Sequence, residues 1–133
     1  MKKLTLLAVA TLLSACQSTP PGSKASLEGE VFYLQRIALP PTAILSVSLQ
    51  DISLADAPAK VIDEPRGQVQ GQVPLVFHLS YDPLKIEPNH RYSVSARIEV
   101  VGKLMFTTTE NHAVRLDGTD PQPLKVRVDP ARY

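Results

Sequence analysis

Residues 92–100 are Tyr-Ser-Val-Ser-Ala-Arg-Ile-Glu-Val, and this stretch decides the fold. Apolar residues occupy every second position from Tyr92 to Val100, and polar residues from Ser93 to Glu99 fill the positions between them. Because successive side chains of a strand point to opposite faces, this alternation predicts a half-buried β-strand. A slip of one residue would turn the whole apolar face towards solvent, so the register is strongly constrained.

The same period of two recurs along the chain and predicts further strands. It is clear around Leu45–Leu49 and Val73–Leu79, and weaker candidates are residues 27–34, 60–63, 103–109 and 124–128. Val101-Gly102-Lys103 predicts a tight hairpin turn, and prolines separate most of the other strands. Residues 53–59 could form one helical turn, but no segment has a sustained helical period. We therefore predict an all-β fold, a compact antiparallel β-sandwich of about seven strands.

The first 15 residues predict a secretion signal. Two lysines follow Met1, and an apolar run extends from Leu4 to Leu13. A bilayer span needs about 20 apolar residues, so this run is too short to remain as a membrane anchor. Residues 1–15 are therefore expected to be removed, which leaves 118 of the 133 residues.

The signal ends in Leu13-Ser14-Ala15-Cys16, which resembles the lipobox of bacterial lipoproteins. The resemblance implies cleavage between Ala15 and Cys16 and lipid attachment at Cys16. Cys16 is the only cysteine of the sequence, so an internal disulfide bond is excluded. Several acyl chains on one residue give stable anchoring, since each buried CH₂ contributes about 0.8 kcal/mol. By resemblance to enterobacterial sorting signals, the Gln17-Ser18 pair implies the outer membrane and its periplasmic face.

Residues 16–25 are polar and rich in Pro, Gly and Ser, so we expect a flexible lipidated tether. It could hold the domain, residues 26–133, at most ~30 Å from the membrane. Without Lys2 and Lys3 the chain has 12 basic and 13 acidic residues. Such a balance does not favour nucleic-acid binding, which needs a concentrated basic face.

The sequence contains no recognisable motif for catalysis or metal binding. His78, His90 and His112 have no ligand-type neighbour at a metal-like spacing, and glycines form no phosphate-binding loop. There is no nucleophile elbow and no cysteine beyond Cys16. We therefore expect no enzymatic activity, no metal and no cofactor.

Three residues are candidates for contact with a partner protein. Arg36 precedes an apolar, proline-stiffened loop and could anchor a partner, although bonding to loop carbonyls or to an acidic side chain is the alternative. Val76 and Met105 lie opposite the main apolar stripe of their predicted strands. Their side chains could form an apolar patch outside the core, or they could belong to a second buried face.

Several motifs, taken together and in order, resemble the YbaY/YscW family of lipoproteins. They are residues 36–43, 47–53, 55–59, 73–77 and 81–83, Ile86, Pro88, Arg91-Tyr92, and residues 102–108. The resemblance implies a compact β-sandwich. One branch of the family contains pilotins, which bind the C-terminal segment of a type III secretion secretin and carry it to the outer membrane. This sequence is more similar to the YbaY branch.

These observations leave two classes of function open. The first is a non-enzymatic binding module, a pilotin-like chaperone or assembly factor that captures a segment of an outer-membrane or secretion-system protein at a sheet edge or apolar groove. The alternative is a structural or glycan-associated envelope lipoprotein. Sugar binding usually needs exposed aromatic side chains, and aromatic residues make up only 5% of this sequence without any Trp.

Overall fold

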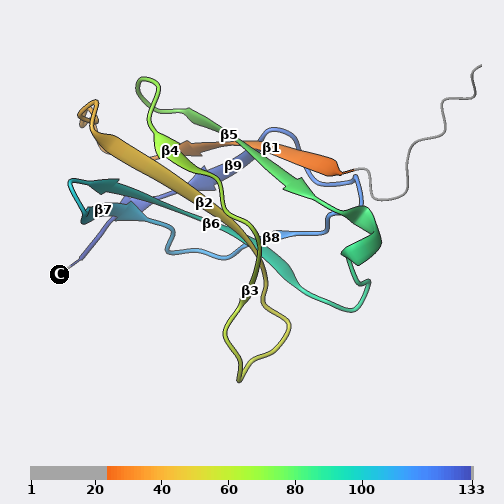
Figure 1. Cartoon of the computed structure of the whole chain (residues 1–133). Coiled ribbons are helices and arrows are strands. Elements are labelled where there is room, and N and C mark those ends of the chain that lie inside the picture. Colours follow the sequence, from red (N-terminus) through yellow and green to blue (C-terminus); the bar gives the residue numbers. More distant parts are fainter. Residues whose placement is uncertain (1–23, 133) are drawn as a thin grey trace, which may run out of the picture.

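The computed structural model describes residues 24–132, which form two packed β-sheets (Figure 1). Ala15 and Cys16, and with them the predicted signal and most of the tether, lie outside the described residues. In chain order the elements are β1 (Ala25–Phe32), β2 (Ala43–Asp51), β3 (Lys60–Asp63), β4 (Arg66–Gln68), β5 (Leu75–Tyr81), the 3₁₀ turn η1 (Pro83–Lys85), β6 (Tyr92–Val100), β7 (Lys103–Thr107), β8 (His112–Val114), β9 (Leu124–Arg127) and β10 (Asp129–Pro130). In this part of the chain, no helix has the length and apolar character to cross a membrane.

The predicted β-sandwich is confirmed, with one sheet much smaller than the other. The small sheet has the order β5-β1-β9, and the large sheet has the order β10-β7-β6-β2-β3, with β4 also on β2 and β8 also on β6. All pairings are antiparallel except that of β1 with β9, which is parallel. The short strands β4, β8 and β10 were not predicted, since two or three residues are too few to establish an alternation.

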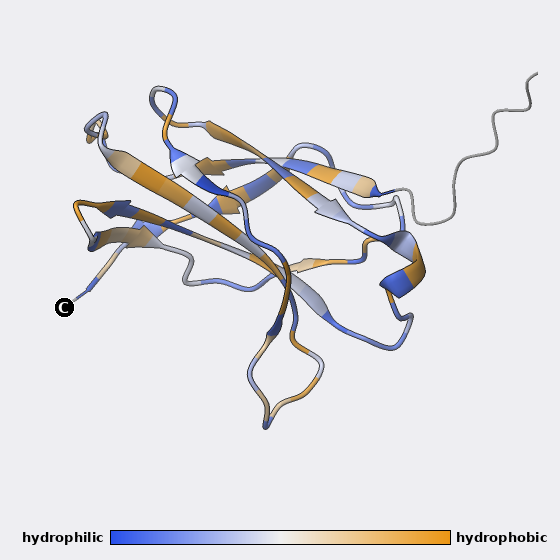
Figure 2. Cartoon of the chain, viewed as in Figure 1, coloured by the Kyte–Doolittle hydropathy of each residue, from blue (hydrophilic) through white to orange (hydrophobic). Residues whose placement is uncertain are grey.

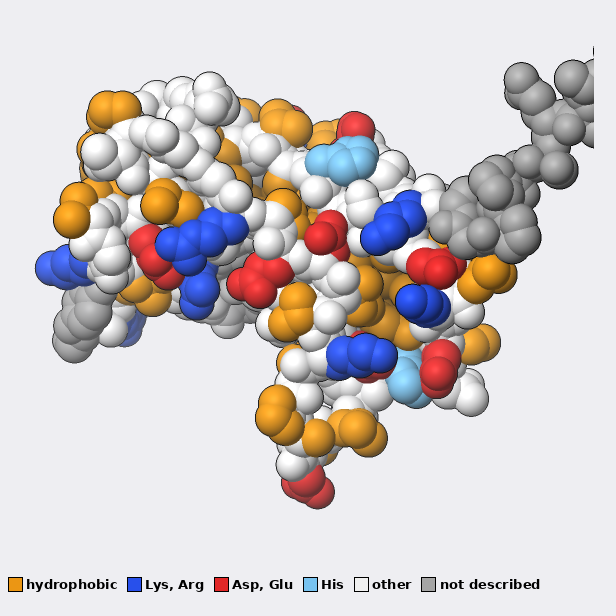
Figure 3. All heavy atoms as spheres, viewed as in Figure 1, with side chains coloured by type: hydrophobic (Ala, Val, Ile, Leu, Met, Phe, Trp, Pro, Cys, Tyr) orange, Lys and Arg blue, Asp and Glu red, His pale blue; other side chains and the backbone are white. Residues whose placement is uncertain are grey.

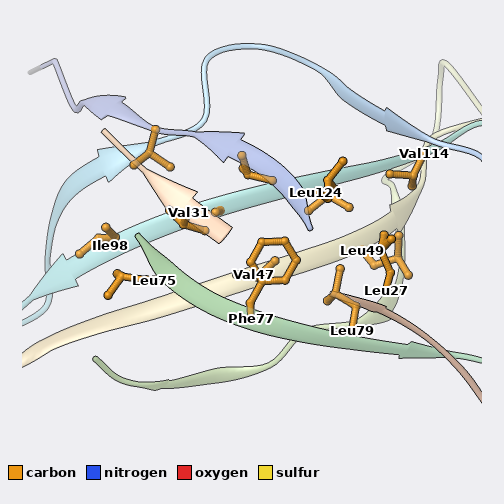
Figure 4. Packing of buried hydrophobic residues seen from close by; sticks show 14 of the residues in the cluster. Leu27, Val31, Val47, Leu49, Leu75, Phe77, Leu79, Ile98, Val114 and Leu124 are labelled. Atoms are coloured by element: carbon orange, nitrogen blue, oxygen red, sulfur yellow. The ribbon is translucent and has the colours of Figure 1, made fainter. Parts of the chain in front are cut away.

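The core lies between the sheets and follows the predicted alternation. On β5, Leu75, Phe77, Leu79 and Tyr81 are buried, while Val76 and His78 are exposed. On β6 the inward positions Val94, Ala96 and Ile98 are buried in the same way. Figure 2 shows the alternating hydropathy along these strands, and Figure 4 shows the apolar side chains from both sheets meeting in the gap. Fully burying each large apolar side chain contributes about 1.5–3 kcal/mol, so these stripes hold the sheets together.

The turns agree only in part with the sequence-based expectation. Val101 and Gly102 both have positive φ values, 51° and 75°, and they form the two-residue turn predicted between β6 and β7. Residues 53–59 form a turn without a helix, because the Asp51 carboxylate accepts hydrogen bonds from the Ser53 N–H and hydroxyl and fixes the start of the loop. The helical turn lies instead at η1, where Asp82 accepts a bond from the Leu84 N–H at 3.0 Å.

Candidate functional site

Strand β5 is an edge strand of the small sheet, and among the described strands it pairs with β1 alone. Its register pairs odd-numbered residues of β5 with odd-numbered residues of β1, for example Phe77 with Gly29. The even-numbered residues of β1 turn towards β9, as the bond from the Val128 N–H to the Phe32 carbonyl shows. The even-numbered residues of β5 therefore turn their N–H and C=O groups away from β1.

Ser80 shows the direction of this open edge independently. Its N–H donates at 2.7 Å to the side-chain carboxylate of Asp63 at the end of β3, not to a strand of the small sheet. Two and four residues earlier, His78 and Val76 point their backbone groups in the same direction. Within the described residues no strand other than β1 pairs with β5, so these backbone groups of Val76 and His78 face an open edge.

A groove of about 650 Å³ runs beside this edge, between β5 and the strands β2 and β4. Its floor consists of core side chains, among them Leu45 and Val47 of β2 and Phe77 of β5. Figure 4 shows Val47 and Phe77 together between the two sheets. Val47 and Phe77 are almost fully buried and Leu45 is half-buried, so the groove reaches the edge of the core, and its apolar floor favours an apolar ligand.

The rim of the groove is basic. Arg66 and His78 line it, and no acidic residue does. Each is oriented by an acidic neighbour: Arg66 Nη2 lies 3.6 Å from Glu99 Oε2, and His78 Nδ1 lies 3.5 Å from Glu28 Oε1. Because the arginine, the histidine and Glu28 are about half exposed or more, these ion pairs orient the rim more than they stabilise the fold.

The structure places the three predicted partner contacts in different settings. Val76 is 75% exposed and lines the groove. Arg36 is exposed on the loop between β1 and β2, outside the groove, and its side chain has no hydrogen bond or ion pair within residues 24–132. Met105 is half-buried and packs against the core cluster, which is the alternative left open above. The groove thus includes Val76 but neither of the other two, and as contacts all three stay predictions.

The loop that carries Arg36 is nevertheless fixed close to the start of β5. Gln72, three residues before the strand, accepts a bond from the Leu39 N–H at 2.7 Å and donates one to the Leu39 carbonyl at 2.9 Å. The Tyr33 hydroxyl also donates to the Ile37 carbonyl inside the loop. Sequence reasoning missed Asp63, Arg66 and His78 as parts of a site, because nothing in the sequence shows which strands become neighbours.

A second hollow, of about 880 Å³, lies at the opposite end of β5 between η1 and the segment after β8. Its floor is formed by Tyr81, Tyr92, Val114 and Leu116, and His90 lies at its edge. Burial raises the pKa of the Tyr81 hydroxyl, and the nearby Asp120 and Asp117 raise it further, so this tyrosine stays neutral.

His90 links the end of β2 to the segment before β6 at this end of the molecule. Its Nδ1 lies 2.6 Å from Asp51 Oδ2, and its Nε2 lies 2.6 Å from Glu87 Oε2. The bond to Asp51 raises the pKa of His90, whereas Ser53 and His90 lower the pKa of Asp51 to about 2. Figure 3 shows one face of the molecule, on which acidic and basic side chains are mixed.

Both ring nitrogens of His90 are used in the contacts with Asp51 and Glu87, so neither nitrogen is left to bind a cation. More generally, residues 24–132 contain no cluster of three histidine, cysteine or acidic side chains that could hold a metal. These contacts join the end of β2 to the segment before β6, which is a structural role.

Comparison with known proteins agrees with the geometry. Residues 22–128 match the family described as type III secretion system lipoprotein chaperone (YscW). The lipoprotein YbaY of Escherichia coli (strain K12) is 43% identical over 99 residues, which cover 74% of this chain and 52% of that protein. The chain thus spans about half the length of this curated relative.

A solved structure is similar over its whole length. It is an alternative pilotin from the type II secretion system of Vibrio cholerae, with a TM-score of 0.72 and 47% sequence identity, and the match covers 82% of this chain and 100% of the pilotin. The match agrees in fold, and its identity is high enough to indicate common ancestry. The motifs, the sandwich and these similarities agree, and the chain belongs to the YscW family of secretion-system lipoprotein chaperones.

Proposed function

We propose that this protein is a lipid-anchored, non-enzymatic binding module of the outer membrane that holds a segment of a secretion-system protein in the groove beside β5. The observation that carries the proposal is the groove itself, with an apolar floor, an open strand edge and the 75% exposed side chain of Val76 on its rim. An apolar groove next to unpaired backbone groups is a common way to capture a peptide segment.

The membrane part of the proposal depends on Cys16. Cleavage after Ala15 and acylation of Cys16 would anchor the domain through the tether, on the periplasmic face of the outer membrane. The similar solved structure is an alternative pilotin from the type II secretion system of Vibrio cholerae, and this similarity supports a secretion-system protein as the partner. Substituting Cys16→Ser is expected to release the protein from the membrane fraction, and retention of this variant there would contradict the anchor.

The alternative of a glycan-associated lipoprotein finds no support in the described residues. Among the aromatic residues of this part of the chain, Phe32 is half-buried and the others are at most 6% exposed, so none offers a fully exposed ring on which a sugar could stack: Tyr33, Phe77, Tyr81, Tyr92 and Phe106. Capture of a protein segment therefore fits the surface better.

The test is photo-crosslinking of the full-length lipoprotein in cells, with a benzophenone amino acid at position 76. Leu84 of η1 gives the matched control, because it is 78% exposed and lies outside the groove. We expect a dominant adduct with one envelope protein from position 76 and not from position 84. Equal adducts from both positions, or only adducts with abundant neighbours, would contradict the proposal.

A further inference from the structure

We propose that the partner segment binds as an extended strand, pairing with β5 as the fourth strand of the small sheet. This inference rests on the proposed function and specifies how the same groove recognises its ligand. The open edge offers four backbone groups, the N–H and C=O of Val76 and of His78. Residues two apart on a strand are separated by about 6.6–6.8 Å, which is the spacing at which a neighbouring strand presents its own groups.

Asp63 shows that this edge accepts such a neighbour. Its carboxylate receives the Ser80 N–H at 2.7 Å, in the position where the carbonyl of a pairing strand would lie. The side chain therefore already completes one bond of the missing ladder. An amphipathic helix docked in the groove would satisfy none of the remaining groups, because its backbone bonds are internal.

The two ends of the open edge set the length of the segment. At one end Pro74 has no N–H to donate, and at the other end Ser80 is occupied by Asp63. Only Val76 and His78 offer both groups between these limits. The pairing part of the ligand is therefore short, about three to five residues.

The surroundings also set the chemistry of the segment. Its inward side chains would rest on Leu45, Val47 and Phe77, so these positions need apolar residues. Its outward side chains would lie beside Val76 and His78 on the exposed face of the sheet. A β-branched residue fits beside Val76, and an acidic residue fits beside His78. If the segment pairs antiparallel to β5, it passes His78 before Val76, so from its N-terminus it reads acidic residue, apolar residue, β-branched residue.

A second copy of the chain fits this edge less well than a partner of opposite charge. Two β5 strands paired around a twofold axis would bring both basic rims, with Arg66 and His78, towards one another. The proposal therefore commits to a segment of another protein that carries an acidic residue.

The substitution that tests the pairing is His78→Pro. Because the N–H of His78 faces the open edge, proline removes no bond to β1 but blocks the approach of a new strand. His78→Ala keeps the backbone donor and removes only the side chain. Lys125→Pro is the matched control, because residue 125 turns its backbone to the outer edge of β9 at the far side of the same sheet.

The probe is a labelled peptide, Ser-Glu-Val-Val-Val-Thr-Ser, and its counterpart with Lys in place of Glu, added to the full-length lipoprotein in detergent micelles. We expect the Glu peptide to bind about tenfold more tightly than the Lys peptide, and His78→Pro to weaken its binding by at least about tenfold. His78→Ala should reduce the preference for Glu, and Lys125→Pro should bind as the unmodified protein does. Amide hydrogen exchange should show new protection of the Val76 and His78 N–H groups in the complex.

Three outcomes would overturn the inference. The first is that His78→Pro binds the peptide as tightly as the unmodified protein, and the second is that the peptide binds without protecting the Val76 and His78 amides. The third is that these amides are equally protected with and without peptide because the protein dimerises through β5, which light scattering would reveal. The proposed function is judged separately, by the crosslink from position 76. If that crosslink forms equally in His78→Pro, the groove still binds a partner but strand addition is wrong.

Discussion

Gly29 allows Phe77 and the backbone of β9 to pack closely against β1. We predict that its replacement by alanine destabilises the fold. Gly29 lies in β1, paired with Phe77 of β5 and Leu124 of β9. A Cβ atom at this position would lie 2.2 Å from Cζ of Phe77 and 2.5 Å from the carbonyl oxygen of Leu124. Favourable contacts between carbon atoms are about 3.5–4.0 Å apart, so the Phe77 contact is too close by more than about 1 Å.

The magnitude follows from what must move. The Phe77 ring can tilt only by disturbing the core that it shares with Val47, and the carbonyl of Leu124 belongs to the backbone of the β1–β9 pairing. Overpacking in a well-packed core typically costs 1–3 kcal/mol, and a forced backbone shift adds to it. We expect Gly29→Ala to lower the free energy of unfolding by about 2–4 kcal/mol, and the melting temperature by about 4 °C or more for each kcal/mol.

The assay is urea denaturation of Gly29→Ala beside Gly67→Ala, its matched control. Gly67 is also in a strand, β4, but a Cβ atom there would meet nothing within 4 Å. This control should be neutral or slightly stabilising, because alanine restricts the unfolded chain.

A double variant separates the two contacts. Phe77→Leu should restore part of the loss in the Gly29→Ala background, since it removes the ring but not the Leu124 carbonyl. If Gly29→Ala changed stability by less than about 0.5 kcal/mol, with an unchanged denaturant slope, the close packing of β1 against Phe77 and β9 would be refuted.

Two further predictions concern the turns and loops. Val101→Asn should raise the free energy of unfolding by about 1 kcal/mol, because valine is strained at φ 51° and Asn-Gly suits a two-residue hairpin; a melting temperature at or below that of the parent would contradict it. The pKa of His90 is raised, so its contacts with Asp51 and Glu87 should stabilise the fold below pH 6.5 and lose this effect as the pH rises through the raised pKa. The pKa of Asp51 is lowered from 3.8 to about 2, so its contribution is present above pH 4 and lost as the pH falls towards 2. The His90→Gln variant should not show the fall in melting temperature that the parent shows as the pH rises through the pKa of His90. If the variant shows the same fall, groups other than His90 cause it.

The sequence predicts the faces of the strands better than their neighbours. The alternation on β5 and β6 correctly places Phe77 and Ile98 in the core and Val76 outside it. It does not encode that β9 joins β1 in parallel, because that pairing connects segments about 95 residues apart. For the same reason, the open edge of β5 and the bond between Ser80 and Asp63 were not foreseen.

Met105 shows how a local irregularity defeats an otherwise sound pattern. Ile98 pairs with Phe106 and Glu99 pairs with Leu104, so Met105 is an extra residue in the ladder. A bulge of this kind shifts the phase of the alternation, and it leaves Met105 half-buried against the core. Period-two reasoning has no means of detecting such an insertion, whereas at Val76 the strand is regular and the expected exposure holds.

The unequal size of the two sheets explains why the groove lies beside β5. Strands lie about 4.8 Å apart, so three strands span about 10 Å between their axes while the five strands of the longer path span about 19 Å. The small sheet therefore leaves part of the large one uncovered. On the β9 side, the Tyr33 ring stacks on Phe106 at 4.3 Å and Val128 is fully buried, so chain segments fill the difference. On the β5 side the Asp63 carboxylate accepts a bond from the Ser80 N–H, and the groove lies between β5 and the strands β2 and β4. The strand addition proposed above would extend the small sheet at this edge and cover the groove.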